Sequence, residues 1–312
     1  MSAQNTDQLL MIRPVSFFMN LQTATDNHYQ QSVDSMNNEK AQEMALKEFD
    51  EFVAKLRKAG VGVTVIEDTA EPVTPDSIFP NNWVSFHEDE SVFLYPMYAE
   101  NRRSERRIDI LEKLEDRGFS IDRVIDLSDA EMDGQFLEGT GSLILDHENR
   151  IAYACLSQRT HPEVLDEWAE LTGYSVVTFH ALQEVDGTWL PIYHTNVMMS
   201  IGDELAILCA DCIKNEAERK AVIASLKNSG KEILYISEKQ TSSFAGNMLQ
   251  IVNDKGEKIM VMSTQAYNSL NPEQIATIQK TNSILHSSLN TIETLGGGSA
   301  RCMMAEVFLP KN

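Results

Sequence analysis

A cysteine near the end of the chain has a setting that suits a nucleophile. Residues 296–304 read GGGSARCMM, so Cys302 follows three consecutive glycines, stands beside Arg301 and opens an apolar run over residues 303–309. Three glycines in a row are typical of a loop whose backbone other groups approach closely, and the apolar run predicts a final strand. A thiolate attacks electrophilic carbon, and a neighbouring positive charge favours it over the thiol. A buried cysteine that only packs is the alternative, because free cysteine is among the most buried residue types.

Two further residues supply the groups that a cysteine nucleophile needs. Glu138 lies in LEGTGS and His194 in HTN, and each precedes a segment that predicts a strand. A histidine can move a proton to and from the reacting atoms, and a carboxylate can orient the imidazole. Asn81 and Asn82 precede a third such strand. If the fold brings these strand starts together, the minimum set for thiol catalysis is present.

The elements that would position these residues form an internal repeat. Helical spacing of apolar residues predicts helices over residues 41–58, 103–117, 162–172, 215–229 and 272–279. The first four are followed by a glycine typical of a left-handed helix stop, at Gly60, Gly118, Gly173 and Gly230. A strand is expected after each glycine, over residues 61–66, 119–125, 174–179 and 232–236, and residues 290–295 are expected to form the fifth. Pairs of strands joined by turn residues lie between the helices, over residues 83–86 with 92–95, 142–145 with 150–154, 197–201 with 205–208, and 248–252 with 258–262.

The repeated unit is therefore strand, strand, helix, strand, and it occurs about five times. Five such units can close into a ring that leaves no open sheet edge. The ring would place Asn82, Glu138, His194 and Cys302 at equivalent corners of one end. No Pro-, Gly- or Ser-rich linker divides the chain, so residues 1–312 are predicted to form a single α/β domain.

The composition argues against several classes of partner. The chain has 312 residues, 47 of them acidic and 26 basic, which gives a formal net charge of −21. Such a charge disfavours nucleic acids and anionic membranes, since both attract a basic surface. No apolar run approaches the roughly 20 residues that span a bilayer, and the polar first ten residues lack a signal-peptide pattern. We therefore expect a cytoplasmic protein.

Cys209 and Cys212 form a C-x-x-C pair, a motif found in both redox and metal sites. No second pair and no neighbouring histidine pair completes a zinc site around them. Cys209 also ends an apolar, strand-like segment, so a structural role is favoured. A thiol redox protein that uses this pair is kept as an alternative.

The ordered set of motifs resembles the pentein, or guanidino-group-modifying, superfamily. The resemblance rests on Glu138 in LEGTGS, His194 in HTN and Cys302 in GGGSARCM, and it covers nearly the whole chain. It implies a five-fold pseudosymmetric α/β-propeller of ββαβ units, in which these three residues are catalytic. Members of the superfamily include arginine deiminases, dimethylarginine dimethylaminohydrolases and amidinotransferases.

The dimethylarginine hydrolase pattern implies further substrate contacts by Asp76 in PDSIFPNN and by two carboxylate-binding arginines, Arg102 and Arg159. Where relatives that act on a guanidinium place carboxylates, this chain has Asn82 and Asn196. A carboxylate pairs with a cationic guanidinium, whereas an asparagine offers an acceptor and an NH₂ donor that match a neutral urea. The two amides therefore favour a ureido amino acid such as citrulline, as in the CtlX-type citrulline-utilisation hydrolases that the chain resembles.

The resemblance and the amides together predict a cysteine-dependent hydrolase that converts citrulline to ornithine, carbon dioxide and ammonia through an S-carbamoyl intermediate on Cys302. Asn81, Asn82 and Asn196 would surround the ureido group, and no metal or organic cofactor is required. An arginine-type deiminase, a dimethylarginine hydrolase or an amidinotransferase would use the same site. A binding propeller without catalysis is the alternative from another class. The polar segment over residues 20–38 is interpreted as a lid, and a homodimer is left open.

Overall fold

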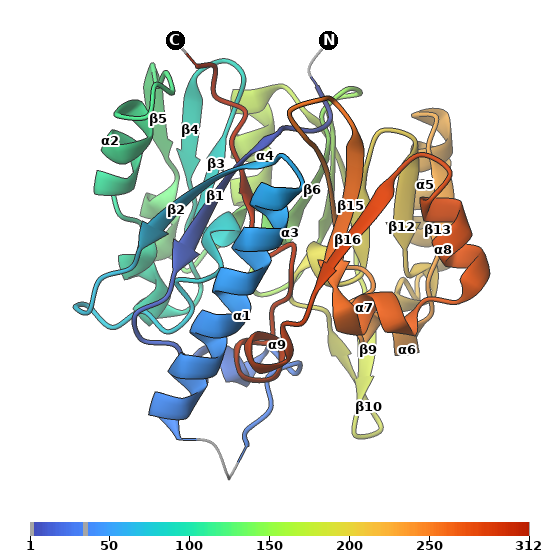
Figure 1. The fold of residues 1–312 in the computed structure, drawn as a ribbon. Coiled ribbons are helices and arrows are strands. Elements are labelled where there is room, and N and C mark those ends of the chain that lie inside the picture. Colours follow the sequence, from blue (N-terminus) through green and yellow to red (C-terminus); the bar gives the residue numbers. More distant parts are fainter. Residues whose placement is uncertain (1–2, 34–36, 312) are drawn as a thin grey trace.

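The computed structural model describes residues 3–33 and 37–311 as small sheets separated by helices (Figure 1). Within these residues there are five three-stranded sheets and one two-stranded hairpin, formed by β9 (Leu182–Val185) and β10 (Thr188–Pro191). In each three-stranded sheet one pair of strands is antiparallel, and the third strand runs parallel to the middle one. This is the order that the predicted repeat requires.

Four of these sheets use strands that follow one another along the chain. They are β3 (Val84–Phe86), β4 (Ser91–Leu94) and β5 (Arg123–Asp126); β6 (Leu143–Asp146), β7 (Ile151–Cys155) and β8 (Ser175–Phe179); β11 (Met199–Ile201), β12 (Leu205–Leu208) and β13 (Glu232–Tyr235); and β14 (Leu249–Val252), β15 (Lys258–Ser263) and β16 (Ser283–Ser287). The fifth sheet joins the two ends of the chain, because β1 (Gln8–Arg13) lies between β17 (Ala305–Glu306) and β2 (Gly62–Glu67). Both chain ends accordingly lie at the same side of the molecule, at the top of Figure 1.

Helices carry the chain from the middle strand of each sheet to the strand parallel to it. They are α1 (Asn38–Lys58), α2 (Asp109–Glu115), α4 (Pro162–Thr172), α5 (Glu216–Asn228) and, in the last unit, α7 (Thr264–Ser269) with α8 (Pro272–Ile278). In α1 the buried residues recur three or four positions apart, as in Phe49, Phe52 and Leu56, and so form one apolar face. The helix predicted from residue 103 begins only at Asp109, because residues 100–105 form a separate 3₁₀ helix.

The predicted glycine stops are confirmed. All four glycines that follow a predicted helix have φ between 71° and 88°, and they are Gly60, Gly118, Gly173 and Gly230. This left-handed conformation costs glycine little, since it has no Cβ, and it turns the chain out of the helix toward the next strand. A local signal in the sequence therefore sets the boundary between helix and strand in four of the five units.

The fifth unit differs from the prediction. Residues 290–295, expected as a strand, form helix α9 (Asn290–Gly296), and the strand beside β15 is β16. The Glu48 carboxylate accepts hydrogen bonds from two backbone N–H groups in the first turn of α9 and satisfies donors that a helix start leaves open. Ile292 and Leu295 are buried three positions apart, which is a helical spacing.

The final strand predicted over residues 303–309 is also shorter than expected. Ala305 and Glu306 form the ladder with β1, and Val307 adds an isolated bridge to Phe86. The N–H groups of residues 302–304 each donate to the carbonyl three residues earlier, so this part of the chain forms turns. Cys302 therefore precedes its strand by one turn instead of opening it.

The mixed α/β class is confirmed, and the closed five-fold ring stays a prediction. Neighbouring sheets touch through their antiparallel edge strands, with β17 against β3, β6 against β11, and β11 against β14. In the part of the chain that the structure describes, no ladder of strand pairs joins one three-stranded sheet to another. Among the described helices, none combines the length and the apolar character needed to cross a membrane.

Candidate active site

Four of the predicted site residues lie where the chain enters the first strand of a sheet. Asn82 ends a 3₁₀ helix ahead of β3, and Glu138 immediately precedes the short helix α3 (Gly139–Ser142) that leads into β6. His194 precedes a 3₁₀ helix ahead of β11, and Cys302 lies in the turn before β17. Asn82, His194 and Cys302 line one small cavity, and Glu138 contacts His194 from behind. The repeat therefore brings together residues that are up to 220 positions apart in the sequence.

Glu138 is a fully buried carboxylate held by three donors. Its Oε2 lies 2.7 Å from His194 Nε2 and 3.3 Å from Arg159 Nη1, and its Oε1 accepts the Tyr98 backbone N–H at 3.0 Å. Burial raises the pKa of Glu138, but the charge of Arg159 and the hydrogen bond from His194 outweigh burial and hold that pKa well below its usual range. Glu138 is therefore ionised at neutral pH and can orient the imidazole.

His194 is neutral at neutral pH and presents one ring nitrogen as a base. Burial lowers the pKa of His194, and its hydrogen bond with Glu138 offsets the effect only in part. Because ionised Glu138 can only accept, Nε2 carries the proton and Nδ1 is left with a free lone pair. A Cβ on Gly141 would stand 2.9 Å from His194 Nδ1 and 2.4 Å from Asn82 Nδ2. The missing side chain of Gly141 therefore makes room for both groups.

The Cys302 sulfur is surrounded by amide groups. Asn196 Nδ2 lies 3.4 Å and Asn247 Nδ2 lies 3.2 Å from Sγ, and the cysteine itself is 5% exposed. Asn247 is a residue that the sequence reasoning missed. It stands ahead of β14, at the strand start of the fifth unit that corresponds to Glu138 in the third. A comparison of equivalent strand starts in the repeated units, which identified the other residues, would also have identified Asn247.

The expected help from Arg301 is not seen. Its guanidinium donates to the Met304 carbonyl at 2.9 Å and to the Glu306 carboxylate at 3.0 Å, and Arg301 is not among the residues that line the cavity. Although Arg301 is next to Cys302 in the sequence, its side chain points to the opposite side of the turn and forms an ion pair with Glu306. Positive charge in the cavity comes from Arg102 and Arg159 instead.

The glycine loop allows other side chains to approach its backbone closely, as predicted. Gly297 ends α9 with φ of 63°, and a Cβ on Gly296 or Gly298 would stand 2.8 Å from ring atoms of Phe79. The loop carbonyls accept hydrogen bonds from Tyr193 Oη and from the Asn27 side chain. Side chains on this loop would push it away from the cavity that it lines.

Both predicted carboxylate-binding arginines line the cavity and are buried. Arg102 donates to Glu105 through Nε at 3.0 Å and Nη2 at 2.9 Å, and through Nη1 to Asn82 Oδ1 at 2.9 Å. Arg159 donates through Nε to Asp26 Oδ2 at 2.7 Å, in addition to its contact with Glu138. Each arginine thus has a protein carboxylate as partner in this structure, and its binding of a substrate carboxylate stays a prediction.

Asp76 and the two neighbouring asparagines differ in where they point. Asp76 and Asn82 line the cavity, whereas the Asn81 side chain donates to Thr140 Oγ1 at 3.3 Å in the wall behind it. Within residues 3–33 and 37–311, four buried atoms of predicted site residues have no hydrogen-bond partner: Asp76 Oδ1, Asn81 Oδ1, Asn82 Nδ2 and Asn196 Oδ1. Burial raises the pKa of Asp76, and the charge of Arg102 lowers it in part. Such atoms are costly in a folded protein unless a ligand completes them.

The described part of the predicted lid covers this cavity. Asn20 Nδ2 donates to Asp76 Oδ2 at 2.7 Å, the Asp26 carboxylate holds Arg159, and the Gln30 side chain donates to the Leu295 carbonyl at 3.0 Å. The space left for the centres of water molecules is about 20 Å³, enough for about one water. Residues 34–36 of the segment interpreted as a lid lie outside the described residues.

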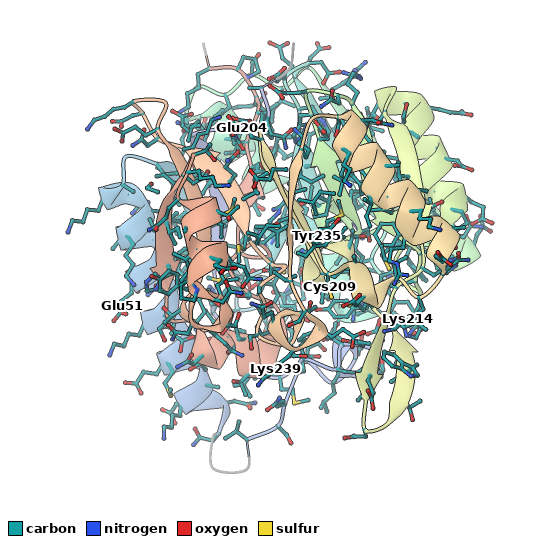
Figure 2. The ribbon with its side chains drawn as sticks, turned by 90° about the vertical axis from the view of Figure 1, so that its right-hand side faces the viewer. Glu51, Glu204, Cys209, Lys214, Tyr235 and Lys239 are labelled. Carbon is teal, nitrogen blue, oxygen red and sulfur yellow. The ribbon has the colours of Figure 1, made fainter. Side chains whose placement is uncertain are left out.

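The C-x-x-C pair lies elsewhere. Cys209 and Cys212 are buried with their sulfurs 3.0 Å apart, and both belong to the core around β11 and β12. Figure 2 shows Cys209 on the side of the molecule that carries β13 and α5. Neither cysteine lines the cavity. In the described residues, no three side chains of His, Cys, Asp or Glu form a group that would hold a metal ion.

The fold and this arrangement of cysteine, histidine and carboxylate place the protein in the pentein superfamily of guanidino-modifying hydrolases, as the motifs predicted. The family model described as N,N dimethylarginine dimethylhydrolase, eukaryotic, matches residues 13–309, so the chain belongs to this family. A search of curated proteins gave no match.

Solved structures of similar fold include two forms of ArgZ, an arginine dihydrolase from the ornithine–ammonia cycle in cyanobacteria. The apo enzyme is 18% identical, with a TM-score of 0.73 over 98% of this chain, which spans 41% of the ArgZ chain. The product-bound N-terminal domain of ArgZ is 18% identical, with a TM-score of 0.71 over 97% of this chain and 99% of that domain. An adduct of dimethylarginine dimethylaminohydrolase with S-methyl-L-thiocitrulline is 14% identical, with a TM-score of 0.62 and coverage of 97% and 99%.

Proposed function

We propose that this protein is a citrulline hydrolase that uses Cys302 as a covalent nucleophile. The observation that carries the proposal is a pair of buried amide atoms that have no partner in the described part of the chain. They are the Nδ2 of Asn82, which lines the cavity with Cys302, and the Oδ1 of Asn196, whose Nδ2 contacts the thiol although Asn196 is not among the residues that line the cavity. A ureido group offers both a C=O that accepts and an NH₂ that donates, so it can complete both amides. A guanidinium has donors alone and would leave the Asn82 NH₂ unpaired.

In the proposed reaction the Cys302 sulfur forms a bond to the ureido carbon, and its proton passes to His194 Nδ1. His194 then protonates the leaving nitrogen, the C–N bond breaks, and ornithine departs from an S-carbamoyl enzyme. Neutral His194 next takes a proton from water, which attacks the carbamoyl carbon and returns the thiol. The released carbamate decomposes to carbon dioxide and ammonia. Ionised Glu138 stabilises the imidazolium that forms in both steps.

Substrate binding is assigned to the remaining residues of the cavity. Arg102 and Arg159 would hold the α-carboxylate and Asp76 the α-amino group. Asn81, whose side chain donates to Thr140 Oγ1 outside the cavity lining, is given no substrate contact. Because the cavity holds about one water molecule when the segment over residues 20–33 is in place, entry of an amino acid requires that segment to move. The Asp26–Arg159 contact would then break and free a cation for the substrate.

Hydrolysis of arginine is the second candidate. It is favoured by the unpaired Asp76 Oδ1, which has no partner in residues 3–33 and 37–311 and could accept from a guanidinium, and by the likeness in fold to an arginine dihydrolase. An amidinotransferase or a deiminase would share the first covalent step. We also propose that residues 1–312 are one domain, whose five sheets close into the five-fold propeller. The support is the common strand order of the five sheets and the contacts between their edge strands.

Purified protein should be incubated separately with citrulline and with arginine, and ornithine, citrulline and ammonia should be measured over time. The proposal expects ornithine and ammonia from citrulline, and none from the Cys302→Ser variant. Release of citrulline from arginine, without ornithine from citrulline, would contradict it and indicate a deiminase. No turnover of either compound, with an alkylation rate at Cys302 like that of a free thiol, would indicate a binding protein.

A further inference from the structure

The orientation of the Asn247 side chain is fixed by its neighbours. Asn247 is 1% exposed, and its Oδ1 accepts the Arg301 backbone N–H at 3.0 Å. Because a backbone N–H can only donate, the oxygen is the amide atom at Arg301. The same Oδ1 also lies 3.6 Å from Cys302 Sγ, farther from the sulfur than either amide nitrogen. The Asn247 NH₂ lies 3.0 Å from the Asn196 carbonyl and 3.2 Å from Cys302 Sγ, so each of its two hydrogens has one acceptor.

A second amide donor meets the sulfur from another strand start. Asn196 Nδ2 lies 3.4 Å from Sγ, and the backbone carbonyl of Asn196 is held by Asn247. Two N–H groups that point at one sulfur favour its anionic form, because hydrogen bonds to an ionised acceptor are about twice as strong as those to a neutral one. The Arg301 guanidinium, which could have favoured the anion by charge, is paired with Glu306.

We propose that Asn247 is a catalytic residue that stabilises the Cys302 thiolate, with Asn196 as the second donor. This assignment rests on the proposed function only in taking Cys302 as the nucleophile, and it holds for any substrate. Asn247 has a double task, since it also holds the backbone of Arg301 and so fixes the turn that carries the thiol. The fifth unit of the repeat, formed by β14, β15 and β16, thereby contributes to the site, as the other four do.

The test is the pH dependence of alkylation of Cys302 by iodoacetamide in the full chain, followed by peptide mass spectrometry. Other charged or titratable side chains that line the cavity with the thiol stay constant in every variant: Asp76, Arg102, Arg159, Tyr193 and His194. Asn247→Asp keeps an acceptor for the Arg301 N–H and replaces the donor with an oxygen. Asn247→Ala removes both contacts and serves if Asn247→Asp does not fold. Asn253→Ala is the matched control, because this buried amide follows the same strand β14 at its other end.

We expect the midpoint of the alkylation profile to rise by about one pH unit in Asn247→Asp and Asn247→Ala, which corresponds to about tenfold slower alkylation below the midpoint. The Asn253→Ala midpoint should equal that of the wild type. A midpoint unchanged in a folded Asn247→Asp protein, as judged by its thermal unfolding, would overturn the proposal and leave Asn247 a structural residue. The assay contains no ureido or guanidino compound, so its outcome is independent of whether citrulline is the substrate.

Discussion

Replacement of Glu138 by glutamine tests the histidine–carboxylate pair without changing its shape. Three donors converge on this carboxylate: the Tyr98 N–H on Oε1, and His194 Nε2 and Arg159 Nη1 on Oε2. Glutamine offers one oxygen and one NH₂, so its NH₂ must face at least one of these donors. If it faces His194, the imidazole must move its proton to Nδ1, and the base of the proposed reaction is lost.

The magnitude follows from the geometry. A hydrogen bond to an ionised partner contributes about 1.5–3 kcal/mol and a neutral one about 1 kcal/mol, so loss of the charge alone costs about 0.5–2 kcal/mol. The full Coulomb attraction between imidazolium and carboxylate at 2.7 Å, with an effective dielectric constant of about 20, sets an upper bound of about 6 kcal/mol. Together with the wrong tautomer, this predicts a fall in kcat of about 100-fold or more.

The assay is ornithine release from citrulline by Glu138→Gln, with kcat and KM measured separately. KM should stay within about threefold, because Glu138 does not line the cavity. Glu131→Gln is the matched control, since Glu131 also accepts a backbone N–H, that of Met97, and pairs with an arginine, Arg106, away from the cavity. A Glu138→Gln enzyme that keeps more than about a third of the wild-type kcat would refute the reasoning.

Three further predictions follow from single positions. Asn82→Asp places a carboxylate beside the substrate carbon while an oxygen still accepts from Arg102. The kcat/KM for citrulline should therefore fall about tenfold or more relative to the kcat/KM for arginine. An unchanged ratio of the two constants would argue against a role of Asn82 in selecting a neutral substrate. Gly141→Ala should remove most of the activity while the protein stays folded, because the new Cβ would meet Asn82 and His194, and retention of normal kinetics would contradict the described packing. Burial raises the pKa of Glu293 to about 7, so the folded state binds a proton that the unfolded chain has lost, and stability should fall as pH rises from about 4.5 through 7 by up to about 3 kcal/mol. The free energy of unfolding in urea should therefore fall less between pH 5 and pH 8 in Glu293→Gln than in the wild type. An equal fall in both proteins would contradict the raised pKa of Glu293.

Local signals in the sequence sufficed for most of the repeat. The glycine that ends a helix and the turn residues that join two strands act over a few positions. The prediction therefore placed each of these features correctly in four units, and both of them in three. The fifth unit lacks the glycine stop, and there the strand was assigned to residues 290–295, which form α9. The capping group of α9 is Glu48, more than two hundred positions earlier in the chain, and no local pattern reveals it.

The site shows the same division between local and distant causes. The convergence of Glu138, His194 and Cys302 follows from the repeat, because each stands at an equivalent strand start. The direction of the Arg301 side chain and the pairing of Asp26 with Arg159 depend on how a turn and a distant loop pack, so the sequence alone did not predict them. The position of Asn247 could have been predicted from the repeat, but its contact with the Cys302 sulfur depends on how two distant strand starts pack together.

The covalent step on citrulline is the central claim, and the mass of the intact protein tests it most directly. The protein should be mixed with citrulline, quenched in acid within the first turnovers, and measured alongside the Cys302→Ser variant. The account predicts one added carbamoyl group, located on the peptide that contains Cys302, together with an equal amount of free ornithine. A wild-type protein of unchanged mass that has released no ornithine, or an adduct on a peptide without Cys302, would contradict it.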